Sequence, residues 1–373
     1  MKHVILAGGN GTRLWPFSRS SLPKQFLKFG DDETLLQKTV RRFYPASSPK
    51  DILVITNQAY FQIAKTQLCA IDPAFASQIL VDPDKRNTGP AIALAVKYFQ
   101  DVLGVDEEEC FFVSSADHLI SPESKLLFAI EQGKKIVKQG YHLIFGIRPS
   151  KPETGYGYIK TKKGEEECFL QVEQFVEKPD QPTAQLYLLS GQYLWNAGMF
   201  LFQIKTFLDD LNKHCHAISH LLKGSFQDVC SRFSEMPDIS IDYALLEKSR
   251  KLRVAPLELS WSDVGSWDSI YEIYDKDSNQ NVKLGNVLDI DTQNCLIVGS
   301  KRLISTVGLK SLVIVDTEDV LFIGKKGESQ KIKSLVDEMK KRNIKESEVH
   351  LVSKDSSEAL LETKSIFAIH ETT

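Results

Sequence analysis

The segment that decides the fold of this chain is Leu6-Ala7-Gly8-Gly9-Asn10-Gly11-Thr12-Arg13-Leu14-Trp15-Pro16, which continues to Pro23-Lys24-Gln25-Phe26. The apolar run Val4–Ala7 predicts a buried strand that leads into a glycine-rich loop. Glycines carry no side chain, so the backbone N–H groups of this loop can approach a phosphate closely. Arg13 and Lys24 can then neutralise different phosphate groups. The segment therefore predicts a site for a small phosphorylated ligand.

Two common phosphate-binding motifs do not fit this segment. A dinucleotide-binding fingerprint needs a third glycine where Leu14 stands, and a Walker A loop needs Gly-Lys-Ser/Thr, which the chain does not contain. The alternative is a tight turn with incidental surface cations. The additional Pro16, Arg19 and Pro23 in the same segment favour phosphate binding over that alternative.

Composition excludes several classes of protein. The 373 residues are 42% apolar and 25% charged, with 46 Lys+Arg against 49 Asp+Glu, as in globular proteins of about two domains. A formal net charge of −3 gives no overall attraction to nucleic acid or acidic lipid, so we expect no nucleic-acid or membrane partner. The six cysteines are scattered without a CxxC pair, and no apolar run approaches the ~18 residues of a membrane span. These features favour a cytoplasmic protein.

Strand and helix patterns alternate through the first part of the chain. A helical pattern begins just after Asn87, with Pro90 in its first position and Thr88-Gly89 as its cap. The alternation predicts an α/β domain with right-handed βαβ units on a mostly parallel sheet. Between Gly155 and Lys178 the pattern becomes hairpin-like, which predicts an antiparallel excursion from that sheet. Runs rich in Val, Ile and Phe predict buried strands at Val4–Ala7, Ile52–Ile55, Ile79–Val81, Cys110–Ser114 and His142–Ile147.

The pattern changes after Tyr274. A polar, linker-like stretch at Asp275–Asn281 precedes several short strand patterns and one amphipathic helix that contains Ile332 and Val336 on its apolar face. We expect a first domain over residues 1–274, a small C-terminal β domain with a terminal helix over 284–345, and a tail of unassigned role over 346–373. We expect the β domain to pack on the first domain or to mediate assembly rather than to bind substrate.

The loop segment resembles the signature of the nucleotide-sugar pyrophosphorylases. Trp15 and Gln25-Phe26 are features of the guanylyl branch, the mannose-1-phosphate guanylyltransferases. The resemblance covers about residues 1–345 and implies a Rossmann-like nucleotidyltransferase domain with a mostly parallel central sheet. It also implies a C-terminal β domain similar to a left-handed β-helix, although no strict six-residue repeat is visible. Seven further motifs match in the family's order: Arg86–Ala91, Ala116–His118, Thr154–Tyr158, Phe175–Pro179, Trp195–Phe200, Ser240–Tyr243 and Trp261–Trp267.

The resemblance implies transfer of GMP from GTP to α-D-mannose 1-phosphate, which gives GDP-mannose and pyrophosphate. The implied catalytic residues are Arg13, Lys24, Asp117 and Asp263. Asp117 and Asp263 are also the implied ligands of the cofactor Mg²⁺, which prefers one or two carboxylates together with phosphate oxygens and water. Asp117 follows the apolar run Phe111–Val113, which predicts a position at the carboxyl end of a strand, where open α/β sheets bind ligands. Taken alone, Asp117 can also be a cap or turn residue, and Asp263 an ordinary loop acid.

The implied binding residues form two groups. At the guanine, Asn87 and Thr88 can alternatively do no more than cap the following helix, and Gly89 stands where relatives often carry Ala. At the sugar, Glu177-Lys178-Pro179 can alternatively do no more than end a strand. The implied nucleotide-binding residues are Ala7, Gly8, Gly9, Gly11, Thr12, Arg13, Arg86, Asn87 and Thr88, with the last three at the base. The implied sugar-phosphate residues are Gly155, Glu177 and Asn196 at the mannose and Lys178 at its phosphate.

Other functions stay open beside this one. The chain can be a pyrophosphorylase for another hexose 1-phosphate or another nucleotide, or a non-catalytic paralogue that senses nucleotide sugars. A non-catalytic paralogue should have lost a cation or an acid among Arg13, Lys24, Asp117 and Asp263, yet all are present. The stretch after residue 284 is too short for an additional phosphomannose isomerase domain, so we expect no isomerase activity. Self-association into a homo-oligomer also stays open.

Overall fold

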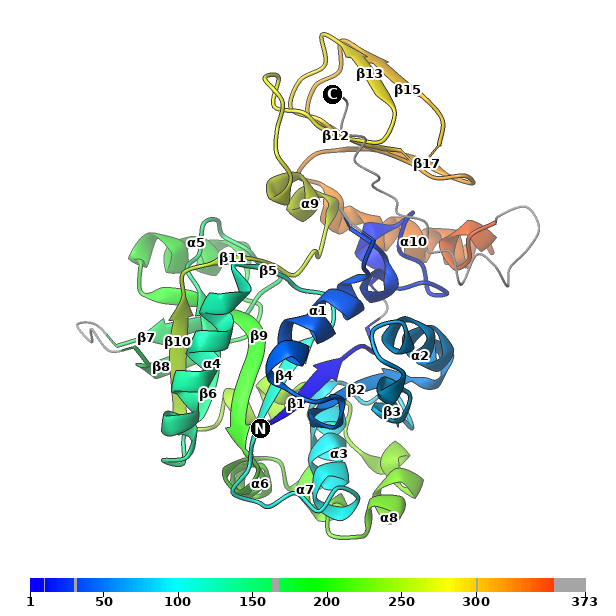
Figure 1. The fold of residues 1–373 in the computed structure, drawn as a ribbon. Helices are drawn as coiled ribbons and strands as arrows, with labels where there is room; N and C mark the ends of the chain where they lie inside the picture. Colours follow the sequence, from blue (N-terminus) through cyan, green and yellow to red (C-terminus); the bar gives the residue numbers. More distant parts are fainter. Residues whose placement is uncertain (10, 30–31, 163–167, 300, 352–373) are drawn as a thin grey trace.

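The first domain is built on a single mixed sheet (Figure 1). The computed structural model describes residues 1–9, 11–29, 32–162, 168–299 and 301–351. Within these ranges the sheet has nine strands in the order β3-β2-β1-β4-β9-β6-β10-β8-β7, of which all but β8 and β9 point the same way. The prediction of a mostly parallel sheet is therefore confirmed. The strands are β1 Lys2–Leu6, β2 Ile52–Asn57, β3 Ile79–Asp82, β4 Cys110–Ser115, β6 His142–Ile147, β7 Tyr158–Thr161, β8 Leu170–Val176, β9 Tyr193–Gln203 and β10 Leu252–Leu257.

Helices cover both faces of the sheet, so the domain has three layers (Figure 1). Successive residues of a strand point to opposite faces, and Phe111 and Phe112 accordingly belong to different buried cores. The core around Phe111 includes residues of α3 Thr88–Asp101, α6 Ile204–His214, α7 His216–Leu221 and α8 Phe226–Ser231. The core around Phe112 includes residues of α1 Leu35–Phe43, α2 Phe61–Cys69, α4 Glu123–Val137 and α5 Gln181–Ser190.

Helix α3 begins where the sequence predicts, but its cap differs. The cap is Asn87, whose Oδ1 accepts a hydrogen bond from the Thr88 N–H at 2.9 Å. Pro90 is the third helical residue rather than the first. The N–H groups of the whole first turn lack partners inside a helix, so a proline is tolerated there as well.

Two antiparallel pairings place the residues that follow β4. The predicted excursion is confirmed, since β7 and β8 pair in antiparallel fashion. A separate short pair joins β5 Leu119–Ser121 to β11 Ser260–Ser262. Because Leu119 faces Ser262 in this pair, the pairing brings Asp117 close to Asp263 from a distant part of the chain.

The C-terminal domain is a small coil of β-strands that ends in α10 Ile332–Lys341 (Figure 1). After α9 Trp267–Ile273, strands β12, β14 and β16 stack in parallel, β13 pairs in parallel with β15, and β17 pairs antiparallel with β16. This arrangement is the expected β-helix-like domain. Its strands are β12 Val282–Leu284, β13 Val287–Ile290, β14 Leu296–Gly299, β15 Ile304–Val307, β16 Leu312–Asp316 and β17 Leu321–Lys325.

A third hydrophobic cluster joins the two domains. It contains Leu14 and Trp15 of the glycine-rich segment, Trp267 of α9, and Ile332 and Val336 of α10. The C-terminal domain therefore packs on the first domain, which is one of the two roles expected for it. Of the predicted tail, residues 346–351 are described and 352–373 lie outside the described residues. Within the described ranges, none of the helices is long and apolar enough to cross a membrane.

Candidate functional site

The glycine-rich loop turns its carbonyl groups toward the protein. The buried Gln25 side chain donates through Nε2 to the carbonyls of Ala7 and Gly9, at 2.9 Å each. Thr56 Oγ1 also donates to Ala7 O at 3.1 Å, and Ser18 Oγ donates to the carbonyl of Gly11. No role was predicted for the signature residue Gln25. In the structure its hydrogen bonds stabilise the loop conformation.

The N–H groups of this loop remain available. No hydrogen bond from the N–H of Gly8, Gly9 or Gly11 occurs within the residues that the structure describes. No heavy atom lies within 4 Å of an added Cβ at Gly8 or Gly9, so the space above the backbone is open. Gly11 differs, because its φ is +54° and an added Cβ would lie 2.8 Å from Lys24 Cγ. The loop therefore presents backbone N–H donors to open space, and Gly11 packs closely against Lys24.

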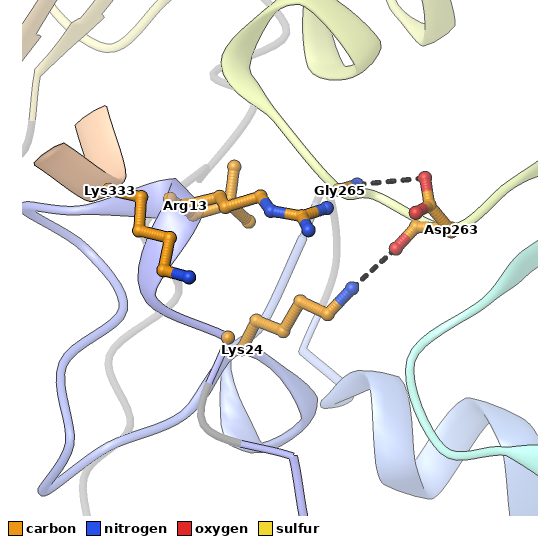
Figure 2. Close-up of a pocket in the computed structure, with 7 residues that line it drawn as sticks. Arg13, Lys24, Asp263, Gly265 and Lys333 are labelled. Atoms are coloured by element: carbon orange, nitrogen blue, oxygen red, sulfur yellow. Dashed lines mark hydrogen bonds between the residues drawn. The ribbon is translucent and has the colours of Figure 1, made fainter. Parts of the chain in front are cut away.

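A pocket of about 280 Å³ opens beside this loop (Figure 2). Three of the four implied catalytic residues, Arg13, Lys24 and Asp263, line it together. Arg13 is exposed and has no ion-pair or hydrogen-bond partner among the described residues. The other lining residues are Gly11, Leu14, Gly265 and Lys333. The Thr12 side chain lies outside the described part of the structure.

Lys24 connects the two acids that the sequence placed far apart. Its Nζ lies 2.9 Å from Asp117 Oδ2. The same Nζ donates to the main-chain carbonyl of Asp263 at 2.6 Å, as Figure 2 shows. Burial alone would raise the pKa of Asp117, but the nearby positive charge of Lys24 holds it below its ordinary value. Asp117 is therefore ionised at neutral pH.

The carboxylate of Asp263 is held in one orientation by two donors. Tyr156 Oη donates to Oδ1 at 2.8 Å, and the Gly265 N–H donates to the same atom at 3.0 Å. Burial and the adjacent Asp263 charge raise the pKa of Tyr156, so its hydroxyl stays protonated and remains a donor. An added Cβ at Gly265 would lie 2.5 Å from Asp263 Oδ2, which explains the glycine there.

The implied base-binding residues lie away from this pocket and carry structural contacts. Arg86 forms an ion pair with Asp84 at 2.8 Å, and Thr88 Oγ1 accepts a hydrogen bond from the Ile241 N–H at 2.9 Å. Asn87 caps α3 with a φ of 69°. The capping alternative therefore describes what Asn87 does in this structure.

Two acceptors that the sequence analysis missed lie beside the loop. Asn57 and Asp82 face each other at the carboxyl ends of β2 and β3, where their side chains project on the same face. Asn57 Nδ2 reaches the Gly8 carbonyl at 3.5 Å. Oδ1 of each residue is buried and has no hydrogen-bond partner among the described residues. Burial raises the pKa of Asp82 to about 7. In the sequence, Asp82 stands just before the Arg86 motif, and this position could have indicated a role in base binding.

Three of the implied sugar residues, Glu177, Lys178 and Asn196, form a second cluster around Asp242. Asn196 Nδ2 donates to Asp242 Oδ1 at 3.0 Å, and Lys178 Nζ donates to Glu177 Oε1 at 2.6 Å. Glu177 Oε2 is buried without a partner among the described residues. Burial, with the nearby Glu177 charge, raises the pKa of Asp242 to about 6. Gly155 donates its N–H to Glu153 Oε1 at 3.1 Å.

Aromatic rings connect this cluster to the acids. The Tyr156 ring lies 5.3 Å from the Trp195 ring and 5.2 Å from the Trp261 ring, measured between centroids. Tyr156 thus contacts Asp263 through its hydroxyl and the residue preceding Asn196 through its ring. Tyr156 therefore links Asp263 to the strand that carries Asn196.

Family models match both domains. The Nucleotidyl transferase model matches residues 2–280. The model of the MannoseP isomerase/GMP-like beta-helix domain matches residues 285–339. The two matches meet between α9 and β13, where the structure passes from one domain to the other.

Curated relatives and a solved structure match most of the chain. The chain is 38% identical over 361 residues to the alginate biosynthesis protein AlgA of Pseudomonas aeruginosa, a match that covers 93% of this chain and 74% of that relative. It is 38% identical over 362 residues to the mannose-1-phosphate guanylyltransferase of Salmonella montevideo, with 93% and 75% covered. A crystal structure described as a mannose-1-phosphate geranyltransferase from Thermus thermophilus superposes with a TM-score of 0.80 at 29% identity, over 91% of this chain and 99% of that one.

Proposed function

Because this chain belongs to the nucleotidyl transferase family, we propose that it transfers GMP from GTP to α-D-mannose 1-phosphate and releases GDP-mannose and pyrophosphate. Relatives that carry the name mannose-1-phosphate guanylyltransferase are 38% identical to it over most of their length. The identities of the sugar phosphate, the nucleotide and the metal ion are part of this proposal.

One observation carries the proposal. A glycine loop whose carbonyls are held inward and whose N–H groups are available borders a pocket that contains Arg13, Lys24 and Asp263. Backbone N–H groups and cations around an open pocket suit a triphosphate, since they neutralise its charge without covalent chemistry. The arrangement supports nucleotidyl transfer over a merely structural turn.

The residues present fit a Mg²⁺ ion. Within the described residues, no three His, Cys, Asp or Glu side chains are grouped so that they could hold a metal by themselves. Asp117 and Asp263 supply oxygen ligands only, as suits an ion that completes its shell with phosphate oxygens and water. We therefore propose that these two carboxylates hold Mg²⁺ when nucleotide is bound. The ion would neutralise charge on the phosphate oxygens.

The reaction is a single in-line displacement. An oxygen of the mannose 1-phosphate forms a bond to the α-phosphorus of GTP, while the bond from that phosphorus to the bridging oxygen breaks and pyrophosphate leaves with the electron pair. Catalysis then depends on alignment and on neutralised charge. Arg13 would hold the triphosphate, and Lys24, already positioned by Asp117, would contact phosphate at the reacting centre.

The two buried acceptors near the loop support guanine as the base. Guanine presents N–H donors on its Watson–Crick edge, and Asn57 Oδ1 and Asp82 Oδ1 are acceptors without partners among the described residues. A buried acceptor left without a donor costs free energy, so a base that presents an acceptor there is disfavoured. This favours GTP over ATP.

The second cluster supports a hexose phosphate as the acceptor. Glu177 Oε2 is buried and without a partner among the described residues, which suits a sugar hydroxyl donor. Lys178 is about half exposed, with a side-chain exposure of 55%, and is free to turn from Glu177 toward a phosphate. Asp242 would act by orienting Asn196.

The first experiment measures pyrophosphate release. Purified protein with GTP, mannose 1-phosphate and Mg²⁺ should release pyrophosphate and GDP-mannose in equal amounts, and Asp263→Asn should lower the rate sharply. Comparison of kcat/KM for GTP, ATP, UTP and dTTP, and for several hexose 1-phosphates, separates the proposal from a relative of different specificity. Release of no pyrophosphate with any of these pairs contradicts the proposal and leaves the non-catalytic alternative.

A second experiment tests the base assignment. Asp82→Asn should reduce the preference for GTP over ATP at least about tenfold, because one acceptor becomes a donor. Since burial raises the pKa of Asp82 to about 7, GTP affinity of the unmodified protein should also weaken as the pH falls below 7. An unchanged preference in Asp82→Asn contradicts this assignment alone.

A further inference from the structure

We propose that Lys333, from the terminal helix of the β domain, is a third cation of the nucleotide pocket. It binds the β- and γ-phosphates of the bound triphosphate and the pyrophosphate that leaves. The inference rests on the function proposed above, because that function makes pyrophosphate the leaving group. It also assigns substrate binding to a domain that the sequence analysis expected only to pack or to mediate assembly.

The position of Lys333 is set by its neighbours on α10. Ile332 and Val336 are 3% and 2% exposed and lie in the same hydrophobic cluster as Leu14 and Trp15 of the glycine-rich segment. Rotation of α10 about its axis would expose both apolar side chains. Lys333, next to Ile332, is therefore held at the edge of the pocket rather than at an arbitrary point on the surface.

The opposite wall of the pocket is tied to the same cluster. Trp267 Nε1 donates to the Trp15 carbonyl at 2.9 Å, and the Gly327 N–H donates to Asp268 Oδ1 at 2.8 Å. These bonds connect the loop that carries Asp263 both to the signature segment and to the chain that leads into α10. The signature segment, the loop that carries Asp263 and helix α10 thus form one packed unit. The distance between Lys333 and Asp263 therefore does not depend on a flexible linker.

Lys333 differs from the other lysines around its helix. Lys331 pairs with Glu328 at 2.6 Å, Lys340 with Glu348 at 3.7 Å and Lys341 with Glu338 at 4.0 Å. Lys333 has no ion-pair or hydrogen-bond partner within the described residues. Its side chain instead points into the pocket, toward Arg13 and Lys24 (Figure 2).

The arrangement indicates which phosphates Lys333 meets. In Figure 2, Arg13 and Lys24 lie between Lys333 and Asp263. The reacting α-phosphate belongs near Asp263 and Lys24, so the β- and γ-phosphates extend toward Arg13 and Lys333. The charge of Lys24 is already balanced in part by Asp117. Arg13 and Lys333 therefore supply the unpaired positive charge that a leaving pyrophosphate needs.

The test is Lys333→Gln, with Lys341→Gln on the same helix as the matched control. In the direction that consumes GDP-mannose and pyrophosphate, we expect Lys333→Gln to raise KM for pyrophosphate about tenfold. In the forward direction KM for GTP should rise similarly. KM for GDP-mannose and for mannose 1-phosphate should stay within about twofold, since neither carries the terminal phosphates. Lys333→Arg should restore most of the loss, and Lys341→Gln should behave as the unmodified protein.

Two results overturn the inference. One is an unchanged KM for pyrophosphate in Lys333→Gln. The other is an equal loss for all substrates together with a lower Tm, which would indicate a structural role. If the unmodified protein shows no turnover, the proposed function fails on its own. Calorimetric titration with inorganic pyrophosphate then decides the role of Lys333: weaker binding by Lys333→Gln supports it, and equal or undetectable binding by both proteins contradicts it.

Discussion

The two halves of the signature segment have opposite environments. In the first half, Gly11 and the exposed Arg13 line the open pocket, and open space lies above the backbone of Gly8 and Gly9. Residues 15–21 are packed under the C-terminal chain. There the fully buried Arg19 donates to both carboxylate oxygens of Asp319, at 2.5 and 2.7 Å. Two arginines six positions apart thus differ in environment, since Arg13 faces the open pocket and Arg19 pairs with a buried carboxylate.

Residues 15–21 are held mainly by hydrogen bonds to residues 346–350, near the end of the described chain. Trp15 Nε1 donates to the Glu346 carbonyl at 2.9 Å, and the Ser21 N–H donates to the Glu348 carbonyl at 3.1 Å. His350 Nε2 lies 3.1 Å from the Phe17 carbonyl. A loop that binds phosphate must leave its N–H groups unpaired, so its rigidity comes from the bonds to its carbonyl groups and from the adjoining half. We call residues 15–21 the anchored half and residues 8, 9 and 11–13 the pocket half.

The largest expected effect is on the anchored half. Arg19→Met should lower the free energy of unfolding by about 3–5 kcal/mol, because Asp319 would be left buried without its partner. Arg13→Met is the matched control and should change it by no more than about 0.5 kcal/mol. Urea denaturation followed by circular dichroism measures both. Equal losses in the two variants would abolish the distinction between the halves.

The next effect is on catalysis. Lys24→Gln should lower kcat/KM about 10²–10³-fold, as is typical when one preorganised electrostatic contact at a reacting phosphate is lost. Lys28→Gln, four residues further along the same segment and outside the pocket lining, is the control and should retain near-normal activity. Steady-state kinetics with GTP and mannose 1-phosphate measure the ratio. A loss below tenfold in Lys24→Gln would remove Lys24 from the reacting centre.

Acid should loosen the anchored half in two steps. Burial lowers the pKa of His350 from 6.5 to about 4, so the unfolded chain binds its proton first and stability falls as the pH drops from 6.5 to 4. For Asp319, burial alone would raise the pKa, but Arg19 lowers it from 3.8 to about 2, so its contribution is present above 3.8 and is lost toward pH 2. Each step should lower the free energy of unfolding by up to about 2 kcal/mol.

The pH dependence of the free energy of unfolding checks this expectation. His350→Gln should reduce the loss of stability between pH 6.5 and 4, to which the buried His3 also contributes, and Asp319→Asn should reduce the loss toward pH 2. A pH profile that neither variant changes would show that these groups do not control the acid stability of the anchored half.

The smallest expected effects concern the glycines of the pocket half. Gly11→Ala should destabilise the fold by about 1–2 kcal/mol, since φ is +54° and the new Cβ would meet Lys24. Gly8→Ala meets no atom within 4 Å and should leave stability within about 0.5 kcal/mol of the unmodified value. It should still raise KM for GTP, up to about tenfold, because the methyl group occupies the space over the backbone. An unchanged KM would show that phosphate does not approach Gly8.

Much of the fold follows from local patterns. Apolar runs located the first strands to within a few residues, and the loop after β1 indicated a phosphate site because glycine spacing and nearby cations are local features. Asp117 was placed correctly at the carboxyl end of β4 for the same reason. Arg19 shows what local patterns cannot predict. It belongs to the signature segment, but the sequence does not indicate whether its charge faces a ligand or a buried carboxylate such as Asp319.

The sequence by itself indicated which segment suits a phosphate, which residues supply cations and acids, and that a β domain follows the first domain. Only the tertiary structure decided which of these groups meet. The pairing of β5 with β11 brings Asp117 to Asp263, the register of β2 with β3 aligns Asn57 with Asp82, and the packing of α10 on Leu14 places Lys333 at the pocket. The physical reason is that periodicity and propensity act over a few residues, whereas these contacts depend on how whole elements bury their apolar faces against one another.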